Sequence, residues 1–565
     1  MKDELQSIIA DALSRTLKLL GKDESIPDIK IDACKNKEHG DFASNIAMVM
    51  AKRIGLPPRE LAEKIVAELA DNALVKQVDI AGPGFINLFI GQSSQLAIVK
   101  TILQQGDQFG RGAAKEGKVQ VEFVSANPTG PLHVGHGRGA AIGDSICRIL
   151  KADGNNVTRE FYYNDAGQQI DNLALSVQLR CQGISPDSDQ WPEDGYRGEY
   201  IIELANSYMA GDSITSSDYE VTGKKDPNDR DGIRQFAVAY LRREQDQDLK
   251  AFDVGFDVFS LESDLYKNGA VESTVEALIA NGHTYEKDGA LWLRATEFGD
   301  DKDRVMRKSS GGYTYFVPDV AYHQKKWRRG FTTVINEQGS DHHGTIARVR
   351  AGLQALDCGI PTHWPDYVLH QMVMVMKGGQ EVKISKRAGS YVTLRDLIDQ
   401  VGKDATRYFL CSRRADSQLV FDIDLALQKS NENPVYYIQY AHARICSAIA
   451  NTAERGDQYN QAAGVKHLDK LNSTEEIELA KKLARYPELI EQAARERGPH
   501  LIATYLRELA ALLHGWYASG NQDKSKQLLI NDANIRNARL ALATATQQVL
   551  ANGLSLLGVS APERM

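Results

Sequence analysis

The chain has 565 residues, 42% hydrophobic and 25% charged, and this ordinary composition excludes a disordered, collagen-like or disulfide-framework protein. Its formal net charge of −8 argues against an indiscriminate binder of polyanions. No apolar run approaches the ~20 residues that a membrane-spanning helix needs, so no membrane partner is expected. The six cysteines lie far apart without a Cys-x-x-Cys pair, which favours neither a zinc site nor a disulfide scaffold and indicates a reducing compartment.

The first part of the chain predicts a small α+β domain. Apolar residues recur at helical spacing from Leu5 to Leu20, and a second helix is expected after Pro57-Pro58. A Gly-Pro-Gly turn then leads into the strand-like run 85–90. Four glycines in the polar run 106–117 indicate a linker, so this domain is placed at residues 1–112.

The next segment has the pattern of a parallel α/β sheet. Alternation over 119–124 predicts a strand, followed by a loop, a helix from about Gly137 to Leu150 and a strand over 156–163. The stretch after Gln182 is polar and acid-rich, and we expect an insertion at about 182–285. Strand signals return at 290–293, 331–335 and 367–376. The whole α/β domain is placed at residues 113–430.

From residue 431 to 565 the pattern is almost entirely helical and predicts an all-α domain. One of its helices interleaves the aromatic and cationic residues Tyr436, Tyr437, Tyr440 and Arg444. Such a mixture suits stacking on unpaired RNA bases, although an aromatic stripe is also typical of a buried helix face.

The loop from Ser125 to Arg138 joins the first sheet strand to its helix, where open α/β sheets bind ligands and free helix N–H groups favour phosphate. His133 and His136 are three apart and can face one ligand, while Gly135 lets a flat group approach the backbone. Three other interpretations are a dinucleotide fingerprint, half of a metal site and two structural histidines. The fingerprint fails because Ile142 occupies its third glycine position.

A second informative stretch, residues 383–389, brings Lys383, Ser385, Lys386 and Arg387 into one compact cationic loop. Such a loop can neutralise a polyphosphate as pyrophosphate leaves. Alone it would more often be a solvated surface, and its combination with His133-Val134-Gly135-His136 favours the nucleotide interpretation.

These two stretches resemble the HIGH and KMSK signatures of class I aminoacyl-tRNA synthetases, with Ile384 in place of the usual Met. Further stretches resemble arginyl-tRNA synthetases in particular, namely residues 122–138, 404–408, 433–444 and 561–565. The resemblance spans the chain. It implies a Rossmann-like parallel-sheet catalytic domain, an N-terminal α+β domain that contacts tRNA and a C-terminal all-α anticodon-binding domain.

The resemblance also implies the reaction, which is ATP-dependent ligation of L-arginine to its cognate tRNA(Arg) through arginyl-adenylate, with release of AMP and pyrophosphate. ATP is a substrate accompanied by Mg²⁺, and no protein-bound metal or organic cofactor is expected. In this family activation typically requires bound tRNA. We expect a cytoplasmic monomer.

Site residues are carried over by the same resemblance. The catalytic residues are His133, His136, Lys383 and Lys386, and the ATP-binding residues are Gly135, Gly137, Asp341, His342 and Ser385. The arginine-binding residues are Glu122, Asn127, Tyr315 and Asp319, and the tRNA-binding residues are Tyr436, Tyr437, Tyr440, Arg444 and Met565.

Elementary chemistry supports the arginine site, because a guanidinium group calls for a carboxylate fork and an aromatic face. Tyr315 and Asp319 are four apart and can share a helical face, although Asp319 could simply balance a helix dipole. The segment 339–343, with Asp341 and His342, could likewise be only a structural turn.

Three other functions stay open at this point. A synthetase for another amino acid such as cysteine would need a zinc–thiolate site, which the cysteine spacing does not offer. A catalytically silent RNA-binding paralogue and a dinucleotide-dependent oxidoreductase are the others. Cations exceed acids by five over 301–330 and again over 377–414, so the negative net charge is compatible with a selective RNA partner.

Overall fold

The structure is a computed structural model that describes residues 2–34, 36–69, 74–216, 220–382 and 392–565. The chain divides into two compact units. One unit comprises residues 1–106, 448–485 and 512–548, and the other comprises residues 107–447, 486–511 and 549–565. Each unit therefore includes part of the C-terminal helical region.

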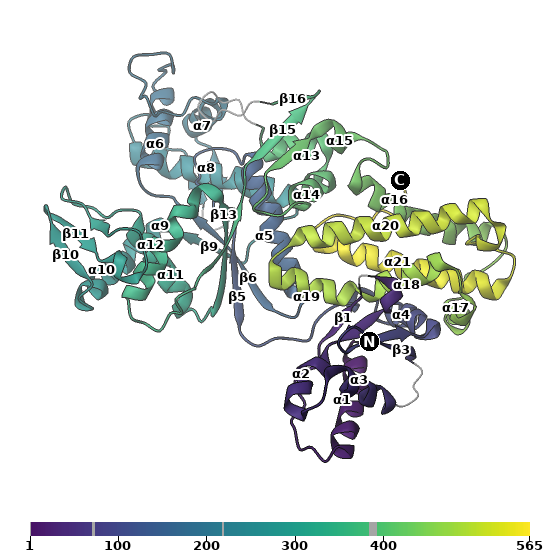
Figure 1. Ribbon diagram of the computed structural model, residues 1–565. Coiled ribbons are helices and arrows are strands. Elements are labelled where there is room, and N and C mark those ends of the chain that lie inside the picture. Colours follow the sequence, from purple (N-terminus) through teal and green to yellow (C-terminus); the bar gives the residue numbers. More distant parts are fainter. Residues whose placement is uncertain (1, 35, 70–73, 217–219, 383–391) are drawn as a thin grey trace. The chain divides into compact units, whose positions relative to one another are not determined.

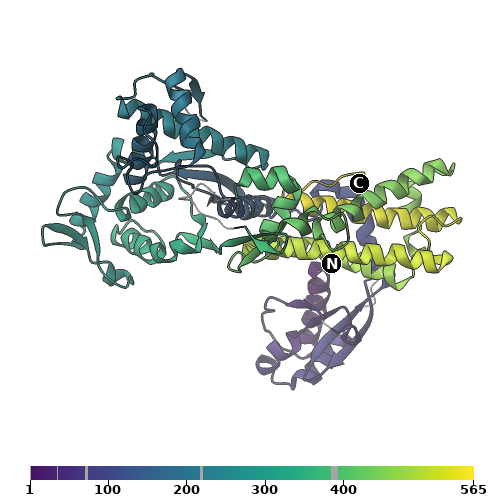
Figure 2. The same cartoon turned by 90° about the horizontal axis from the view of Figure 1, so that it is seen from above.

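The N-terminal part forms an antiparallel sheet with helices packed on it, which confirms the predicted α+β domain (Figure 2). The strand order is β1 (Ile31–Ala33), β2 (Phe42–Ser44), β4 (Phe85–Ile90), β3 (Val75–Ala81). The helices are α1 (Lys2–Leu19), α2 (Ile46–Ile54), α3 (Pro58–Ala67) and α4 (Gln92–Gln105). The apolar faces of α1, α2 and α3 share one core with Ile86, Leu88 and Ile90 of β4. Local periodicity thus located α1 and α3 correctly, whereas α2 and α4 were not predicted.

A parallel five-stranded sheet lies at the centre of the second unit (Figure 1). Its order is β14 (Asp366–His370), β13 (Thr333–Gly339), β5 (Lys118–Glu122), β6 (Asn156–Tyr163), β9 (Val258–Leu261), and every pairing is parallel. Helix α5 (Val134–Ala152) connects β5 to β6, which confirms the predicted strand, loop, helix and strand. The helix begins before the predicted Gly137 because His133 caps its first turn.

The range predicted as an insertion, 182–285, needs a correction, because β9 lies inside it and pairs with β6 at the edge of the central sheet. Strand formation there depends on a partner about a hundred residues away, which local composition does not reveal. The rest of the range contains α7 (Glu199–Ala210), β7 (Ser213–Thr215), β8 (Glu220–Thr222), α8 (Arg230–Ala251), α9 (Glu262–Lys267) and α10 (Ala270–Ala280). Helices α7 and α8 share a core with α6 (Gln168–Cys181).

The predicted strand over 367–376 is also wrong as a single element. It is interrupted after His370, and β15 (Val373–Lys377) joins a different sheet with β16 (Gln380–Glu381) and β17 (Leu419–Asp422). A third sheet contains β10 (Thr284–Lys287), β11 (Ala290–Leu293) and β12 (Arg304–Arg307). Helices α11 (Phe316–Arg328) and α12 (His343–Ala355) contribute to one core with α10 and β11.

After β16 the described elements are helices and the strand β17, and from residue 431 onward they are all helices, as predicted. The elements after the central sheet are α13 (Leu394–Val401), α14 (Lys403–Cys411), α15 (Ile423–Leu427) and α16 (Pro434–Glu454). The last ones are α17 (Gln461–Lys466), α18 (Thr474–Ala484), α19 (Tyr486–Glu496), α20 (Pro499–Gln522) and α21 (Ala533–Leu556). Within the described ranges, no helix is long and apolar enough to cross a membrane. No disulfide joins the six cysteines, all of which lie in the described part of the chain.

Candidate active site

The turn after β5 is strained and firmly held. Val124 and Ser125 have φ values of 67° and 39°, in the left-handed region that residues other than glycine rarely adopt. The Ser125 hydroxyl donates to Glu122 Oε1 at 2.9 Å and accepts from the Tyr162 backbone N–H at 3.1 Å. The turn is therefore fixed between β5 and β6, at the carboxyl edge of the sheet.

His133 and His136 form the cap of α5. His133 Nδ1 accepts from the backbone N–H groups of Gly135 and His136 at 3.1 and 3.3 Å, and His136 Nδ1 accepts from the N–H of His133 at 3.3 Å. Their rings stack with centroids 3.6 Å apart. Because a neutral ring nitrogen that accepts a hydrogen bond carries no hydrogen, each ring has its N–H at Nε2. Two imidazole donors thus lie at the positive end of a helix dipole, a suitable place for phosphate.

The glycines of this turn are required by packing. A Cβ on Gly135 would lie 2.9 Å from the His133 ring, and a Cβ on Gly137 would lie 2.9 Å from Leu394 in α13. These contacts explain why glycine is needed beside His133. The binding of ATP at Gly135 and Gly137 stays a prediction.

The second signature falls on Lys383, Ser385 and Lys386, which lie outside the described residues. The chain next described after them contacts the first signature directly. Val134 N–H donates to Val392 O at 3.2 Å, and Leu394 N–H donates to Leu132 O at 2.8 Å. The structure therefore brings Val392 and Leu394 to the turn that contains His133.

The loop around Asn127 is held from two helices. Asn127 Nδ2 donates to Gln169 of α6 at 2.7 Å. The buried side chain of Gln245 in α8 donates to the carbonyls of Asn127 and Gly130 at 3.1 and 3.0 Å. Asn127, which is predicted to bind arginine, thus lies on a loop that hydrogen bonds from two helices hold in place.

Tyr315 and Asp319 lie at the start of α11, as the spacing predicted. Tyr315 is its N-cap residue and is 61% exposed. Asp319 keeps only a small exposed face, and this burial, together with the charges of Glu262 and Glu122, raises the pKa of its carboxyl group to about 7. Burial likewise raises the pKa of Glu262 to about 7, although its Oε2 accepts from Tyr162 OH at 3.3 Å. Two poorly solvated carboxyl groups would suit a planar cation, and the binding of arginine by Tyr315 and Asp319 stays a prediction.

The structure places Glu122 differently from a simple substrate contact. It is buried and forms an ion pair with the ammonium group of Lys326, whose side chain is completely buried. Lys326 also donates to Asn336 Oδ1 at 2.9 Å. Lys326 already neutralises the charge of the Glu122 carboxylate. The predicted contact of Glu122 with arginine stays a prediction.

Sequence reasoning missed Glu262, Lys326, Asn336 and His323. Lys326 was included among the positive charges of residues 301–330 that suit RNA. The number of these charges that RNA could meet is smaller, because some are buried or paired. Besides the buried Lys326, Arg329 is paired with Glu160 at 2.7 Å and Arg304 with Asp300 at 2.7 Å. A basic segment of the sequence does not reveal which of its side chains are buried.

Asp341 and His342 lie directly after β13, in the 3₁₀ turn Ser340–His342. Both side chains are exposed, and His342 Nε2 lies 3.7 Å from Asp341 Oδ2. The turn follows the carboxyl end of β13, next to the strand that ends at Glu122. This location suits a ligand at the sheet edge, and their contact with ATP stays a prediction.

The predicted RNA-binding residues form a ladder on α16. Tyr436 and Tyr440 stack with centroids 6.0 Å apart, and the guanidinium of Arg444 lies 4.6 Å from the Tyr440 ring centroid. These three side chains and Tyr437 are half-buried, and Met565 at the C-terminus is 53% exposed. The ladder thus presents partly exposed rings, with RNA contact still to be tested.

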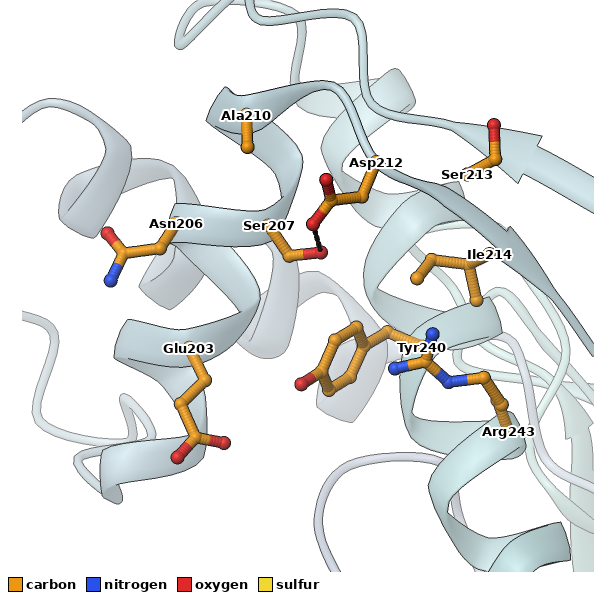
Figure 3. A pocket seen from close by; sticks show the side chains of 9 residues that line it. All are labelled: Glu203, Asn206, Ser207, Ala210, Asp212, Ser213, Ile214, Tyr240 and Arg243. Carbon is orange, nitrogen blue, oxygen red and sulfur yellow. Dashed lines mark hydrogen bonds between the residues drawn. The ribbon is translucent and has the colours of Figure 1, made fainter.

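A separate hollow of about 640 Å³ lies between α7, β7 and α8 (Figure 3). Its lining is polar, with the Ser207 hydroxyl donating to Asp212 Oδ2 at 2.7 Å and Arg243 stacked on Tyr240. Within the described part of the chain, none of the predicted site residues lines it. The hollow is therefore not a part of the predicted site.

Comparison with known proteins agrees with this geometry. Residues 3–90 match the model of the arginyl tRNA synthetase N terminal domain, residues 98–425 that of the class I (R) tRNA synthetase catalytic domain, and residues 438–565 that of the DALR anticodon binding domain. Proteins named arginine–tRNA ligase from Geotalea daltonii and Geobacter metallireducens are each 58% identical to this chain, over 100% of both chains. The Thermus thermophilus arginyl-tRNA synthetase structure shares the fold, with a TM-score of 0.74 and 22% identity over 99% of this chain and 100% of that one. The chain therefore belongs to the arginyl-tRNA synthetase family.

Proposed function

We propose how this arginine–tRNA ligase divides its reaction among its residues. In the first step the arginine carboxylate attacks the α-phosphorus of ATP, and the bond to pyrophosphate breaks. In the second step the terminal ribose hydroxyl of tRNA attacks the arginyl carbonyl, and AMP leaves. No group of the protein forms a covalent bond, so catalysis consists of positioning and electrostatic stabilisation.

The arginine site is the observation that supports the specificity best. Asp319 and Glu262 are poorly solvated carboxyl groups that a guanidinium would keep ionised, and Tyr315 supplies an aromatic face. A cysteine side chain would satisfy neither acid. Asn127 and Glu122 are proposed to contact the charged ends of the amino acid.

For ATP, we assign the phosphates to His133 and His136 at the start of α5. The departing pyrophosphate is assigned to Lys383 and Lys386. The nucleoside is assigned to Gly135, Gly137, Asp341 and His342, and Ser385 is also proposed to contact ATP. Mg²⁺ is proposed to arrive with ATP, because it usually binds through substrate phosphates and keeps several of its waters.

We also propose a monomeric, cytoplasmic enzyme. The substrates of the reaction are available in the cytoplasm, where translation takes place.

Asp319→Asn tests the arginine site. Loss of the charge is expected to raise the KM for arginine about 10- to 100-fold, since a hydrogen bond to a charged group contributes about 1.5–3 kcal/mol. The KM for ATP is expected to stay within about twofold. Asp416→Asn, which changes an exposed acid paired with Arg414, serves as the matched control for aminoacylation assays. Equal effects of Asp319→Asn on both substrates would point to a folding defect and contradict the assignment.

Tyr440→Leu tests the ladder on α16. Stacking on an RNA base contributes about 1–3 kcal/mol, so the KM for tRNA is expected to rise about tenfold, with arginine and ATP unaffected. The exposed Tyr517 of α20 provides a control, Tyr517→Leu. An unchanged KM for tRNA would show that the ladder is only a packed helix face.

A further inference from the structure

Lys326 is the centre of a buried polar chain beneath the arginine site. A completely buried lysine must be paired, because an isolated ammonium is very costly to desolvate. Lys326 donates to Glu122 of β5 and to Asn336 of β13, and its ammonium lies 4.4 Å from the centroid of the Tyr322 ring. A single side chain of α11 thereby connects the helix to two strands of the central sheet.

The direction of every hydrogen bond in this chain follows from Lys326, which has donors only. Asn336 must accept through Oδ1, so its Nδ2 is the donor toward His323 Nε2 at 2.8 Å. Nε2 of His323 then carries no hydrogen, and Nδ1–H donates to the backbone carbonyl of Asp319 at 2.7 Å. Burial, with the nearby charge of Lys326, lowers the pKa of His323 to about 3, so the ring is neutral as this polarity requires.

The two ends of the chain are the two functional segments of the site. At one end the second oxygen of Glu122 accepts from Ser125 in the strained turn that follows β5. At the other end His323 holds the first turn of α11, which contains the carboxyl group assigned to the guanidinium. Five residues therefore join the nucleotide loop to the arginine site.

We propose that Lys326, Asn336 and His323 are positioning residues for arginine, because the chain Glu122–Lys326–Asn336–His323–Asp319 fixes the first turn of α11 against β5 and β13. This inference deepens the proposed function and rests on Asp319 binding arginine. None of the three touches the reacting atoms. They act through the direction in which the Asp319 carboxylate is held.

His323→Leu and His323→Gln separate this role from general stability. Leucine removes the donor and the acceptor, and the KM for arginine is expected to rise about tenfold because misplaced groups lose binding steeply. Glutamine offers an amide donor to Asp319 O and a carbonyl acceptor to Asn336, so its KM for arginine is expected within about threefold of that of the unchanged enzyme. For both variants the KM values for ATP and tRNA are expected to change less than about twofold.

Gln324→Leu is the matched control. It removes a buried amide from the adjacent position of the same helix, outside the chain of hydrogen bonds, and is expected to leave the KM for arginine unchanged. Thermal unfolding of each variant reports whether α11 remains folded. If His323→Leu unfolds below the assay temperature, Asn336→Ser replaces it, since serine is too short to reach both partners and should give the same arginine-selective loss.

The outcomes distinguish a failure of the positioning role from a failure of the arginine site itself. An unchanged KM for arginine in His323→Leu, an equal rise for ATP, or a glutamine variant as defective as the leucine variant would overturn the positioning role. Asp319→Asn is measured in parallel. If that variant also leaves the KM for arginine unchanged, the arginine site itself is wrong. If only Asp319→Asn has an effect, the site stands and the positioning proposal fails.

Discussion

Lys386→Ala is expected to lower the rate of arginine activation by about 10²-fold or more. On the proposed assignment, its charge would meet the negative charge that develops on pyrophosphate as the bond to the α-phosphorus breaks, and removing one such contact typically costs this much. Pyrophosphate exchange with arginine and tRNA present measures the step. The KM for arginine is expected to change little, because the contact forms mainly in the transition state.

Lys302→Ala provides the control, since Lys302 is an exposed lysine in the loop before β12. An unchanged rate in Lys386→Ala would show that the lysine segment is only a surface. Val392 and Leu394, the next residues that the structure describes, are hydrogen-bonded to the loop of His133.

Arg407→Met is expected to destabilise the second unit by about 3 kcal/mol, at the lower end of what breaking a buried ion pair costs. Arg407 is completely buried and donates to Leu557 O and Phe252 O, each at 2.8 Å, and to Asp144 of α5. The substitution leaves both carbonyls without this donor. Asp144 retains its ion pairs with Arg148 at 2.6 Å and with Arg159 at 3.0 Å. These pairs limit the loss of stability.

Calorimetric unfolding checks this result, with Arg414→Met as the control because Arg414 is an exposed arginine in an ion pair. A melting temperature as little changed by Arg407→Met as by the control would contradict the buried network. The neighbouring Gly558, with φ of 66°, belongs to the same packing, since a Cβ there would lie 2.3 Å from the Arg407 guanidinium.

The defect of Arg407→Met is expected to depend on pH. Burial by itself would raise the pKa of Asp144, but Arg407, Arg148 and Arg159 outweigh it and hold that pKa below its usual value. Stability from the ionised carboxylate is therefore present above about pH 4 and is lost as the pH falls through the lower folded pKa. The difference in the free energy of unfolding between Arg407→Met and the unchanged protein should therefore become smaller below about pH 4.

The sequence located much of the candidate site because those signals are local. The end of the strand at Glu122, the histidine pair and the start of the helix with Tyr315 and Asp319 are each set by residues within a few positions of one another. The helix that contains Tyr436, Tyr440 and Arg444 was likewise predicted from its local pattern, whereas their stacking was seen only in the structure.

Signals that depend on distant partners were missed. The strand β9 forms by pairing with β6, and composition alone assigned its residues to an insertion. The run 367–376 looked continuous, yet its two halves pair in different sheets. In both cases hydrogen-bond partners far along the chain decided the structure.

The sequence by itself determined the family, the order of domains and the chemical groups available for arginine and ATP. Only the tertiary structure decided how those groups are charged and held. Lys326 reads as one of several surface cations, but it is buried against Glu122, 204 residues away. Burial makes each unpaired charge costly, so the packed interior selected its partners and oriented the site.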